Sequence, residues 1–207
     1  MLIQKGNAVD LIQTFDKDID LIVTDPPYAF GGSGAEHELS ATVAVALRES
    51  SLRLRRGSWM VVMSASSYRS VSYMIESVRG IMTPVRFGTW VKPVVRSKVR
   101  TAGWGWASVI AVAMRRGPKN RKDLVEPCGM DWIESSVVTN GRRAQLPQNV
   151  SDWAVMPYVV PGGVFLDPFA GSGALMLSAE RSGMDAHGFE INPELHNGKF
   201  ARGEGGG

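Results

Sequence analysis

Short apolar runs alternate in this chain with segments in which apolar residues recur at helical spacing. This alternation favours a mostly parallel β-sheet that is covered by helices on both faces. Seven runs have the composition expected of strands: Leu2–Gln4, Asp20–Thr24, Ser58–Ser64, Pro84–Val91, Ala107–Met114, Val164–Leu166 and Ala186–Phe189. We therefore predict an α/β fold with a doubly wound, mostly parallel, seven-stranded sheet.

The strongest helix pattern begins with a capping box formed by Ser33 and Glu36. Apolar residues then recur at helical spacing at Leu39, Val43 and Leu47. Arg55 and Arg56 suit the last turn of this helix and Gly57 suits its end, because cations and glycine favour helix C-termini. Further helices are predicted at Ala8–Thr14, Ser67–Val78, Val150–Tyr158 and Gly173–Ser182.

A chain of 207 residues suits one domain with a buried core. With 44% apolar and 21% charged residues, its composition is that of an ordinary globular protein. Periodicity fades over Gly117–Gln148, where turn formers and charges collect. We predict a single domain over residues 1–207, with a small insertion at about residues 115–145 rather than a second domain.

Several classes of site are excluded by the residues available. Cys128 is the only cysteine, so neither an internal disulfide nor a thiolate zinc cluster can form. His37, His187 and His196 lack metal-ligand spacing, and we expect no metal. No apolar stretch approaches the ~20 residues that cross a bilayer, and Met1–Lys5 lacks a signal-peptide pattern. We expect a protein that stays in the cytoplasm, with no membrane partner.

Positive charge is concentrated in one part of the chain, although the net charge is only +3. Between Glu76 and Asp123 there is no acidic residue, which creates a local field suited to a polyanion. The candidate nucleic-acid contacts are Lys92, Arg96, Lys98, Arg100, Trp104, Arg115, Arg116, Lys119, Arg121 and Lys122. The cations would mainly bind phosphates, and Trp104 or Trp106 could stack on bases. For a single cation the alternative is a solvated surface charge, and for each tryptophan it is core packing.

The segment Val164–Ala174 combines a strand, a glycine turn and the start of a helix. Gly171 and Gly173 allow the backbone to approach a ligand closely, because no Cβ stands in the way. In open parallel sheets, ligand crevices lie at the carboxyl ends of the strands. The alternative for this turn alone is a tight structural connection.

An acidic residue, Glu190, follows the next predicted strand, about 20 residues beyond the glycine turn. A carboxylate at that place can accept hydrogen bonds from both hydroxyls of a ribose. A third glycine and a phosphate-binding Lys-Ser/Thr pair are missing, which favours an adenosine without a pyrophosphate, such as S-adenosylmethionine. A solvated carboxylate at a strand end is the alternative for Glu190 alone.

The stretch Asp25-Pro26-Pro27-Tyr28 ends the apolar strand Asp20–Thr24. Proline excludes the helical region for Asp25, and the two prolines fix their own φ angles. Because proline has no N–H, this rigid segment presents hydrogen-bond acceptors beside the Tyr28 ring. Two acceptors could hold the exocyclic amino group of a nucleobase and turn its lone pair toward an electrophilic methyl group.

A base held in this way must first leave its duplex, since the amino group cannot be reached inside the stack. Tyr28 would then stack on the flipped base. The alternative is that Asp25–Tyr28 is only a strand-ending turn.

These segments together resemble the β-class DNA adenine-N6 methyltransferases of bacteria and phages, in which the catalytic motif precedes the cofactor motif. Asp25–Tyr28 matches the family's catalytic motif, and Asp167–Gly173 matches its cofactor motif, Asp-Pro-Phe-x-Gly-Ser-Gly. Glu190 matches the acid that holds the cofactor ribose. The resemblance implies a permuted form of the Rossmann-like fold of S-adenosylmethionine-dependent methyltransferases.

The resemblance also implies roles for individual residues. Catalysis would involve Asp25, Pro26, Pro27 and Tyr28. Cofactor contacts would come from Asn7, Asp25, Asp167, Phe169, Gly171, Ser172, Gly173, Glu190 and Asn192. Asn7 stands where the family commonly has an acid, and Leu146 in Ala144–Pro147 replaces the lysine of a Thr-Gln-Lys-Pro segment. Trp90-Val91-Lys92 resembles a Trp-x-Lys stretch of a later strand.

The function implied is methyl transfer from S-adenosylmethionine to adenine N6 in DNA, with a flipped target base, in the cytoplasm of a bacterial or phage-infected cell. Target reading would fall to Pro93–Gly105 and Gly117–Arg143, whose small size implies short or relaxed specificity. Three alternatives remain open: cytosine-N4 methylation of DNA, adenine-N6 methylation of RNA, and a catalytically inactive partner subunit that binds nucleic acid. Self-association into a homodimer is also left open.

Overall fold

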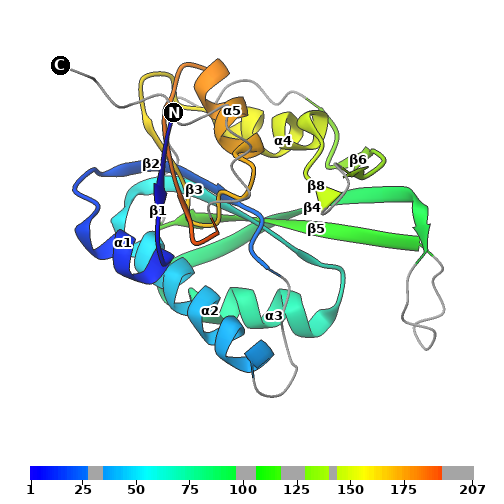
Figure 1. The fold of residues 1–207 in the computed structure, drawn as a ribbon, viewed down its shortest axis with the longest axis horizontal. Coiled ribbons are helices and arrows are strands. Elements are labelled where there is room, and N and C mark those ends of the chain that lie inside the picture. The colour runs from blue at the N-terminus through cyan, green and yellow to red at the C-terminus, as the bar shows by residue number, and fades with distance from the viewer. Residues whose placement is uncertain (28–34, 97–105, 118–128, 140–143, 193–207) are drawn as a thin grey trace.

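The computed structural model describes residues 1–27, 35–96, 106–117, 129–139 and 144–192. Its centre is an eight-stranded sheet (Figure 1). The strands follow one another across the sheet in the order β1 (Leu2–Lys5), β10 (Asp185–Glu190), β9 (Val164–Asp167), β2 (Ile19–Thr24), β3 (Leu54–Ala65), β5 (Trp106–Arg116), β4 (Met82–Arg96) and β6 (Trp132–Glu134). Strand β5 runs antiparallel to its two neighbours, and the other pairings of this sheet are parallel.

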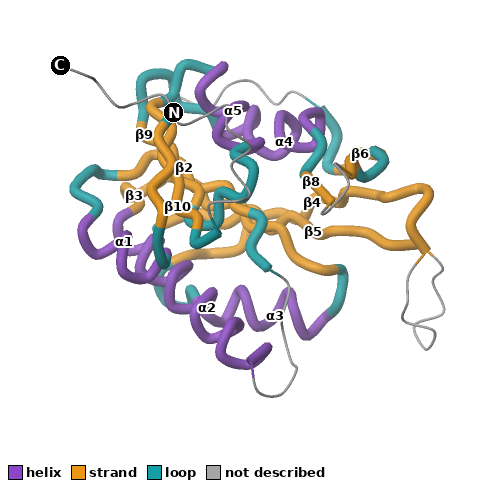
Figure 2. Tube along the Cα trace, in the orientation of Figure 1, coloured by secondary structure: helices purple, strands orange, loops and turns teal. Residues whose placement is uncertain are grey.

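Helices cover both faces of the sheet, as Figure 2 shows. Those of one face are α1 (Ala8–Thr14), α2 (Ala35–Arg53) and α3 (Tyr68–Ser77), and those of the other are α4 (Gln148–Val155), the 3₁₀ turn η1 (Met156–Tyr158) and α5 (Ala174–Arg181). Strand β2 shows why the sheet is doubly wound, since all six of its residues are buried. Ile22 packs in the core under α1, α2 and α3, whereas Leu21 and Val23 pack in the core under α4 and α5. The predicted α/β fold and all seven predicted strands are therefore confirmed.

The eighth strand lies in the region that the sequence predicts to be a loop. β6 extends the sheet beside β4, with Thr89 opposite Trp132, and the Thr89 N–H donates to the carbonyl of Asp131 over 2.9 Å. The same region contributes a two-stranded ribbon of β7 (Val138–Thr139) and β8 (Ala144–Gln145). Strands of two or three residues are too short to leave a periodic pattern in the sequence.

The predicted end of the long helix is wrong by one turn. Helix α2 ends at Arg53, and β3 begins immediately with Leu54, which is fully buried. Arg55–Arg56 lies in the strand, and Gly57 follows there with φ +86°. Arg53, the last residue of α2, donates to the backbone carbonyls of Gln13 and Phe15 at the end of α1, which holds the carboxyl end of α2 against α1.

The apolar stripe of α2 begins later than predicted. Val43 and Leu47 are fully buried, but Leu39 is 40% exposed. The predicted capping residue Ser33 lies outside the described residues. The helix is therefore anchored by its carboxyl-terminal half.

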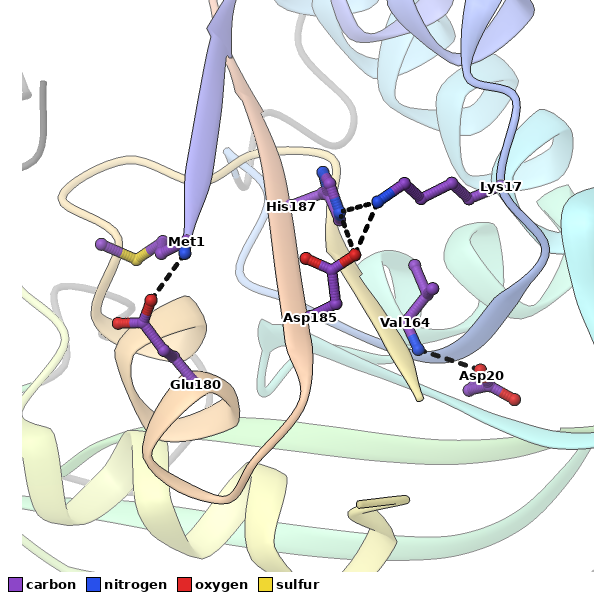
Figure 3. A network of polar contacts seen from close by, with 7 residues as sticks. All are labelled: Met1, Lys17, Asp20, Val164, Glu180, Asp185 and His187. Carbon is purple, nitrogen blue, oxygen red and sulfur yellow. Dashed lines mark hydrogen bonds and ion pairs between the residues drawn. The ribbon is translucent and has the colours of Figure 1, made fainter. Parts of the chain in front are cut away.

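Polar contacts join segments from both ends of the chain at the edge of the sheet where β2, β9 and β10 begin (Figure 3). The Asp20 carboxylate accepts the N–H of Val164 over 2.9 Å, which ties the start of β2 to the start of β9. Beside it, Lys17 forms an ion pair of 2.6 Å with Asp185, and His187 Nε2 lies 3.0 Å from the same carboxylate oxygen. These contacts set the register that brings the opposite ends of the same strands together.

Candidate active site

The two segments predicted to carry the chemistry meet at the carboxyl ends of β2 and β9. These strands are adjacent and parallel, with Leu21 opposite Phe165 and Ile22 opposite Leu166. Thr24, the last residue of β2, donates its hydroxyl to Asp167 Oδ1 over 2.6 Å, and both residues are buried. The hydrogen bond spans 143 positions of the sequence, so the fold makes one site from two distant segments.

Asp25 and the two prolines extend from this junction. Asp25 is half-buried, Pro26 is buried and Pro27 is exposed, so the segment rises from the core toward solvent. The negative charge of Asp25 helps to raise the pKa of Asp167, which places the two carboxyl groups within electrostatic reach. Tyr28 lies outside the described residues, and its stacking role stays a prediction.

The glycine turn has the tight geometry that its sequence predicts. Asp167 Oδ1 also accepts the N–H of Phe169 over 3.0 Å, which starts the turn. Gly171 and Gly173 have φ angles of +52° and +81°, a left-handed conformation that other residues rarely adopt. Ser172 lies between them, half-buried, and α5 begins directly after Gly173.

Glu190, at the end of β10, lies beside the glycine turn. Its Oε2 accepts the N–H of Gly171 over 2.9 Å, and its Oε1 accepts the N–H of Asn192 over 2.7 Å. Each carboxylate oxygen has lone pairs for more than one hydrogen bond, so both can also accept from a ligand hydroxyl. The structure therefore brings Glu190 to the glycine turn, as the spacing in the sequence predicts.

Asn7 lies next to this acid but already has a structural role. The N–H of Gly6 donates to the carbonyl of Glu190 over 3.0 Å. The Asn7 side-chain oxygen accepts the N–H of Val9 over 2.9 Å and caps α1, a role in which asparagine is common. A cofactor contact by Asn7 stays a prediction.

Three carboxyl groups lie at the ends of β2, β9 and β10: Asp25, Asp167 and Glu190. Complete burial, together with the charges of Asp25 and Glu190, raises the pKa of Asp167 to about 7, against the hydrogen bonds from Thr24 and Phe169. The charges of Asp25 and Glu190, each at the end of its own strand, thus act on the Asp167 carboxyl group. A cationic group beside Asp167 would lower the cost of ionising it, so the residues suit a positively charged ligand such as a sulfonium.

The basic residues predicted to bind nucleic acid are divided by the fold. Because β5 is antiparallel, its end lies at the edge where β2 and β3 begin, so Arg115 and Arg116 are at the opposite edge from Asp25. Arg116 donates to the carbonyl of Leu54. These two arginines therefore lie away from Asp25 and the glycine turn, and their contact with nucleic acid stays a prediction.

The other predicted contacts have different positions. Lys92 is half-buried in β4, and Arg96 is the last residue of that strand. The remaining candidates lie outside the described residues: Lys98, Arg100, Trp104, Lys119, Arg121 and Lys122.

The structure shows contacts of Thr24 and Leu146 that the sequence does not reveal. The sequence predicts Thr24 only as a strand end, but its hydroxyl joins the two halves of the site. A polar residue at the end of a fully apolar run, directly before Asp25, is the signal that could have indicated it. Leu146, where the resemblance expects a lysine, packs against the apolar clusters beneath α4.

No helix in the described part of the chain is long and apolar enough to cross a membrane. Within the same residues, no group of three or more His, Cys, Asp or Glu side chains is arranged to hold a metal ion.

The fold is shared with solved structures of methyltransferases, although no protein-family model and no curated protein matches the sequence. The complex of M1.HpyAVI with SAM has a TM-score of 0.74 and 21% identity, over 94% of this chain and 95% of that chain. The cytosine-N4-specific PvuII DNA methyltransferase has a TM-score of 0.74 and 18% identity, over 93% and 82%.

A third structure is TTHA0409 of Thermus thermophilus, a proposed DNA modification methylase complexed with S-adenosyl-L-methionine. It has a TM-score of 0.72 and 19% identity, over 94% of this chain and 89% of that chain. The chain therefore has the Rossmann-like α/β fold of these proteins.

Proposed function

We propose that this protein is an S-adenosylmethionine-dependent DNA methyltransferase whose target is the N6 amino group of adenine. The observation that carries the proposal is the buried hydrogen bond between Thr24 and Asp167. It fixes the acceptor-rich segment Asp25–Pro27 beside the glycine turn, so that a base and a methyl donor could meet in one crevice.

The cofactor half of the proposal is supported by the donor set. Glu190 offers two acceptor oxygens at the end of β10, as a ribose diol requires, and its anchoring by Gly171 and Asn192 fixes their direction. Asp25, Asp167 and Glu190 together favour a cation over a neutral ligand. When bound, S-adenosylmethionine supplies an electrophilic methyl group on a positively charged sulfur.

The catalytic half assigns Asp25 the role of hydrogen-bond acceptor for the target amino group. The amino nitrogen of a nucleobase is a poor nucleophile because its lone pair is delocalised into the ring. The Asp25 carboxylate and the carbonyl of Pro26 would hold its two N–H groups and turn the lone pair out of the ring plane. The same acceptors stabilise the positive charge that develops on this nitrogen.

The choice of adenine is supported by Asp25 itself, because cytosine-N4 enzymes of the resembled family more often have serine there. The fold does not discriminate between the two, since one similar structure is a cytosine-N4-specific enzyme. RNA adenine and an inactive partner subunit remain the other candidates. Target reading is assigned to Pro93–Gly105 and Gly117–Arg143, which lie mostly outside the described residues.

The test is to incubate the protein with methyl-labelled S-adenosylmethionine and either unmethylated DNA or RNA, and to digest the product to nucleosides. We expect label in N6-methyladenine from DNA. Label only in N4-methylcytosine, or only in RNA, would replace the proposed target with one of the alternatives. Label in neither polymer would leave the inactive partner subunit.

A further inference from the structure

Helices α4 and α5 pack against each other on one face of the sheet (Figure 1). Helix α5 begins directly after the glycine turn, and α4 begins directly after Leu146 and Pro147. Leu146 packs against the apolar cluster that contains Ala170 of the turn and Leu175 of α5. The position of α5 against α4 therefore affects where the glycine turn lies.

A closed ring of three hydrogen bonds joins the two helices. Gln148 Nε2 donates to Asp152 Oδ1 over 3.0 Å and to Ser178 Oγ over 2.8 Å. Ser178 Oγ in turn donates to Asp152 Oδ1 over 2.6 Å, which is shorter than its 3.4 Å contact with the carbonyl of Ala174. An amide NH₂ has two hydrogens and a hydroxyl has one, so each donor hydrogen of the ring is used once.

The ring fixes how the helices are aligned along their axes. Gln148 is the first residue of α4, and Asp152 lies one turn later on the same face. Ser178 is 1% exposed and lies in the second turn of α5. Both helices also contribute apolar side chains to one cluster, among them Ala154 and Ala179. Apolar burial is non-directional, whereas hydrogen bonds of this geometry form in only one alignment of the helices.

The glycine turn depends on that alignment, because its amides form short hydrogen bonds with fixed partners. The N–H of Ala170 donates to a carbonyl of β10 over 2.8 Å, and the N–H of Gly173 donates to the carbonyl of Ala170 over 2.7 Å. The N–H of Gly171 donates to Glu190 Oε2 over 2.9 Å. Leu177 of α5 donates its N–H to the carbonyl of Gly173 over 2.9 Å. A shift of α5 along its axis would therefore carry Gly173 with it and lengthen the contacts of the turn.

We propose that Gln148, Asp152 and Ser178 form a positioning unit for the cofactor site: their ring sets the alignment of α5 against α4 and thereby holds the glycine turn against Glu190. The three side chains act through α5 and are not assigned a contact with the ligand. The identity of the ligand rests on the proposed function, whereas the effect on the turn belongs to the free protein.

The first test is amide hydrogen exchange, followed by NMR, in the free protein. Asp152→Ala removes the acceptor of the ring, and Ser178→Ala removes only the hydroxyl that joins the helices. We expect the amides of Ala170, Gly171 and Gly173 to exchange about tenfold faster in both variants, relative to the amides of β2, because a hydrogen bond to a charged group is lost. Unchanged exchange at the turn, or an equal acceleration in β2, overturns the proposal.

Two further variants control for charge and for the stability of α4. Asp152→Asn keeps an acceptor oxygen, so the ring can form without the charge, and we expect exchange at the turn to stay close to the wild-type rate. Asn149→Ala is the matched control on the same helix, since its exposed side chain accepts a hydrogen bond from Ser135 Oγ over 3.1 Å. We expect it to leave exchange at the turn unchanged. If it accelerates that exchange as much as Asp152→Ala, any weakening of α4 has this effect and the ring has no positioning role.

The second test separates cofactor binding from turnover. We expect the Kd for S-adenosylmethionine, measured by calorimetry, to rise about tenfold in Asp152→Ala and in Ser178→Ala. The kcat with saturating cofactor should stay within about twofold of wild type, because Asp25 follows β2 and not α5. An unchanged Kd in both variants overturns the role of the ring in the cofactor site. Faster exchange at the turn in the variants, combined with a wild-type protein that binds no S-adenosylmethionine, would overturn the proposed function but not the hold of the ring on the turn.

Discussion

The hydroxyl of Thr24 donates a hydrogen bond to Asp167 Oδ1 over 2.6 Å in the interior of the protein. This contact joins the carboxyl ends of β2 and β9. At their amino ends, the Asp20 carboxylate accepts the N–H of Val164. Two residue pairs set the register between these strands. The side chains at the two ends therefore fix the alignment that brings Asp25 to the glycine turn.

Removing this hydroxyl should weaken both the fold and the site. In Thr24→Val the shape is nearly conserved, but a buried acceptor loses a donor, which costs about 1 to 3 kcal/mol of unfolding free energy. Thr24→Ser keeps the hydroxyl and is the control. Urea denaturation measures the difference, and a Thr24→Val protein as stable as wild type would show that the bond is not needed to align the strands.

The buried Asp167 predicts an unusual dependence of stability on pH. Its folded-state pKa is raised to about 7 from 3.8, so the folded protein binds more protons than the unfolded chain between these values. Stability from this group is therefore present below about pH 4 and is lost as the pH rises toward 7. We expect Asp167→Asn to remove this decline, measured as the free energy of unfolding at about pH 5 and about pH 8. If the unfolding free energy changes equally between these two pH values in wild type and Asp167→Asn, burial does not raise the pKa of Asp167.

Asp185, the first residue of β10, should make stability depend on pH in the opposite direction. Its hydrogen bonds with Lys17 and His187 lower its pKa from 3.8 to about 2. Its stabilising contribution is therefore full above about pH 4 and is lost as the pH falls toward 2. The effect is small because the side chain is 49% exposed. We expect Asp185→Asn to lower the Tm at neutral pH and to have less effect near pH 2. The control variant Asp16→Asn, at an exposed residue, should leave the Tm unchanged at both pH values. A Tm change as large in acid as at neutral pH would contradict this account.

Gly188 in β10 leaves room for the glycine turn and for the helix that follows it. A Cβ at this position would overlap the Met176 sulfur and lie 2.8 Å from the Ala170 Cβ. Gly188→Ala should therefore cost about 1 to 3 kcal/mol and weaken cofactor binding, because the turn must move away from β10. The double variant Gly188→Ala/Met176→Ala should recover part of the cofactor affinity, as measured by calorimetry. A double variant that binds no better than Gly188→Ala would indicate that Met176 is not the obstacle.

The sequence predicts this fold well for strands that are buried on both faces of the sheet. The apolar run Leu21–Val23 and the glycine turn need no long-range information, because each is defined by its own residues. The basic run is different, since β5 carries its residues from one edge of the sheet to the other. Charge spacing cannot show that Arg116 and Lys92 lie on opposite edges, and only the strand directions reveal it.

Asp25 provides the test that separates catalysis from cofactor binding. It follows β2 and is itself one assigned cofactor contact, whereas most of the other assigned contacts lie at the ends of β9 and β10. Asp25→Ala removes the acceptor for the target amino group and should lower kcat by about 10² to 10³ or more, the cost of losing one transition-state hydrogen-bonding group. Because the negative charge of Asp25 favours a cationic cofactor but is only one of several assigned contacts, the Kd for S-adenosylmethionine should rise modestly, by less than about tenfold. Single-turnover assays with labelled cofactor and calorimetric titration measure the two quantities.

Asp25→Asn is the matched variant, since it keeps the shape and one acceptor oxygen but not the charge. An Asp25→Ala protein with normal turnover would remove the rigid acceptor segment from the mechanism.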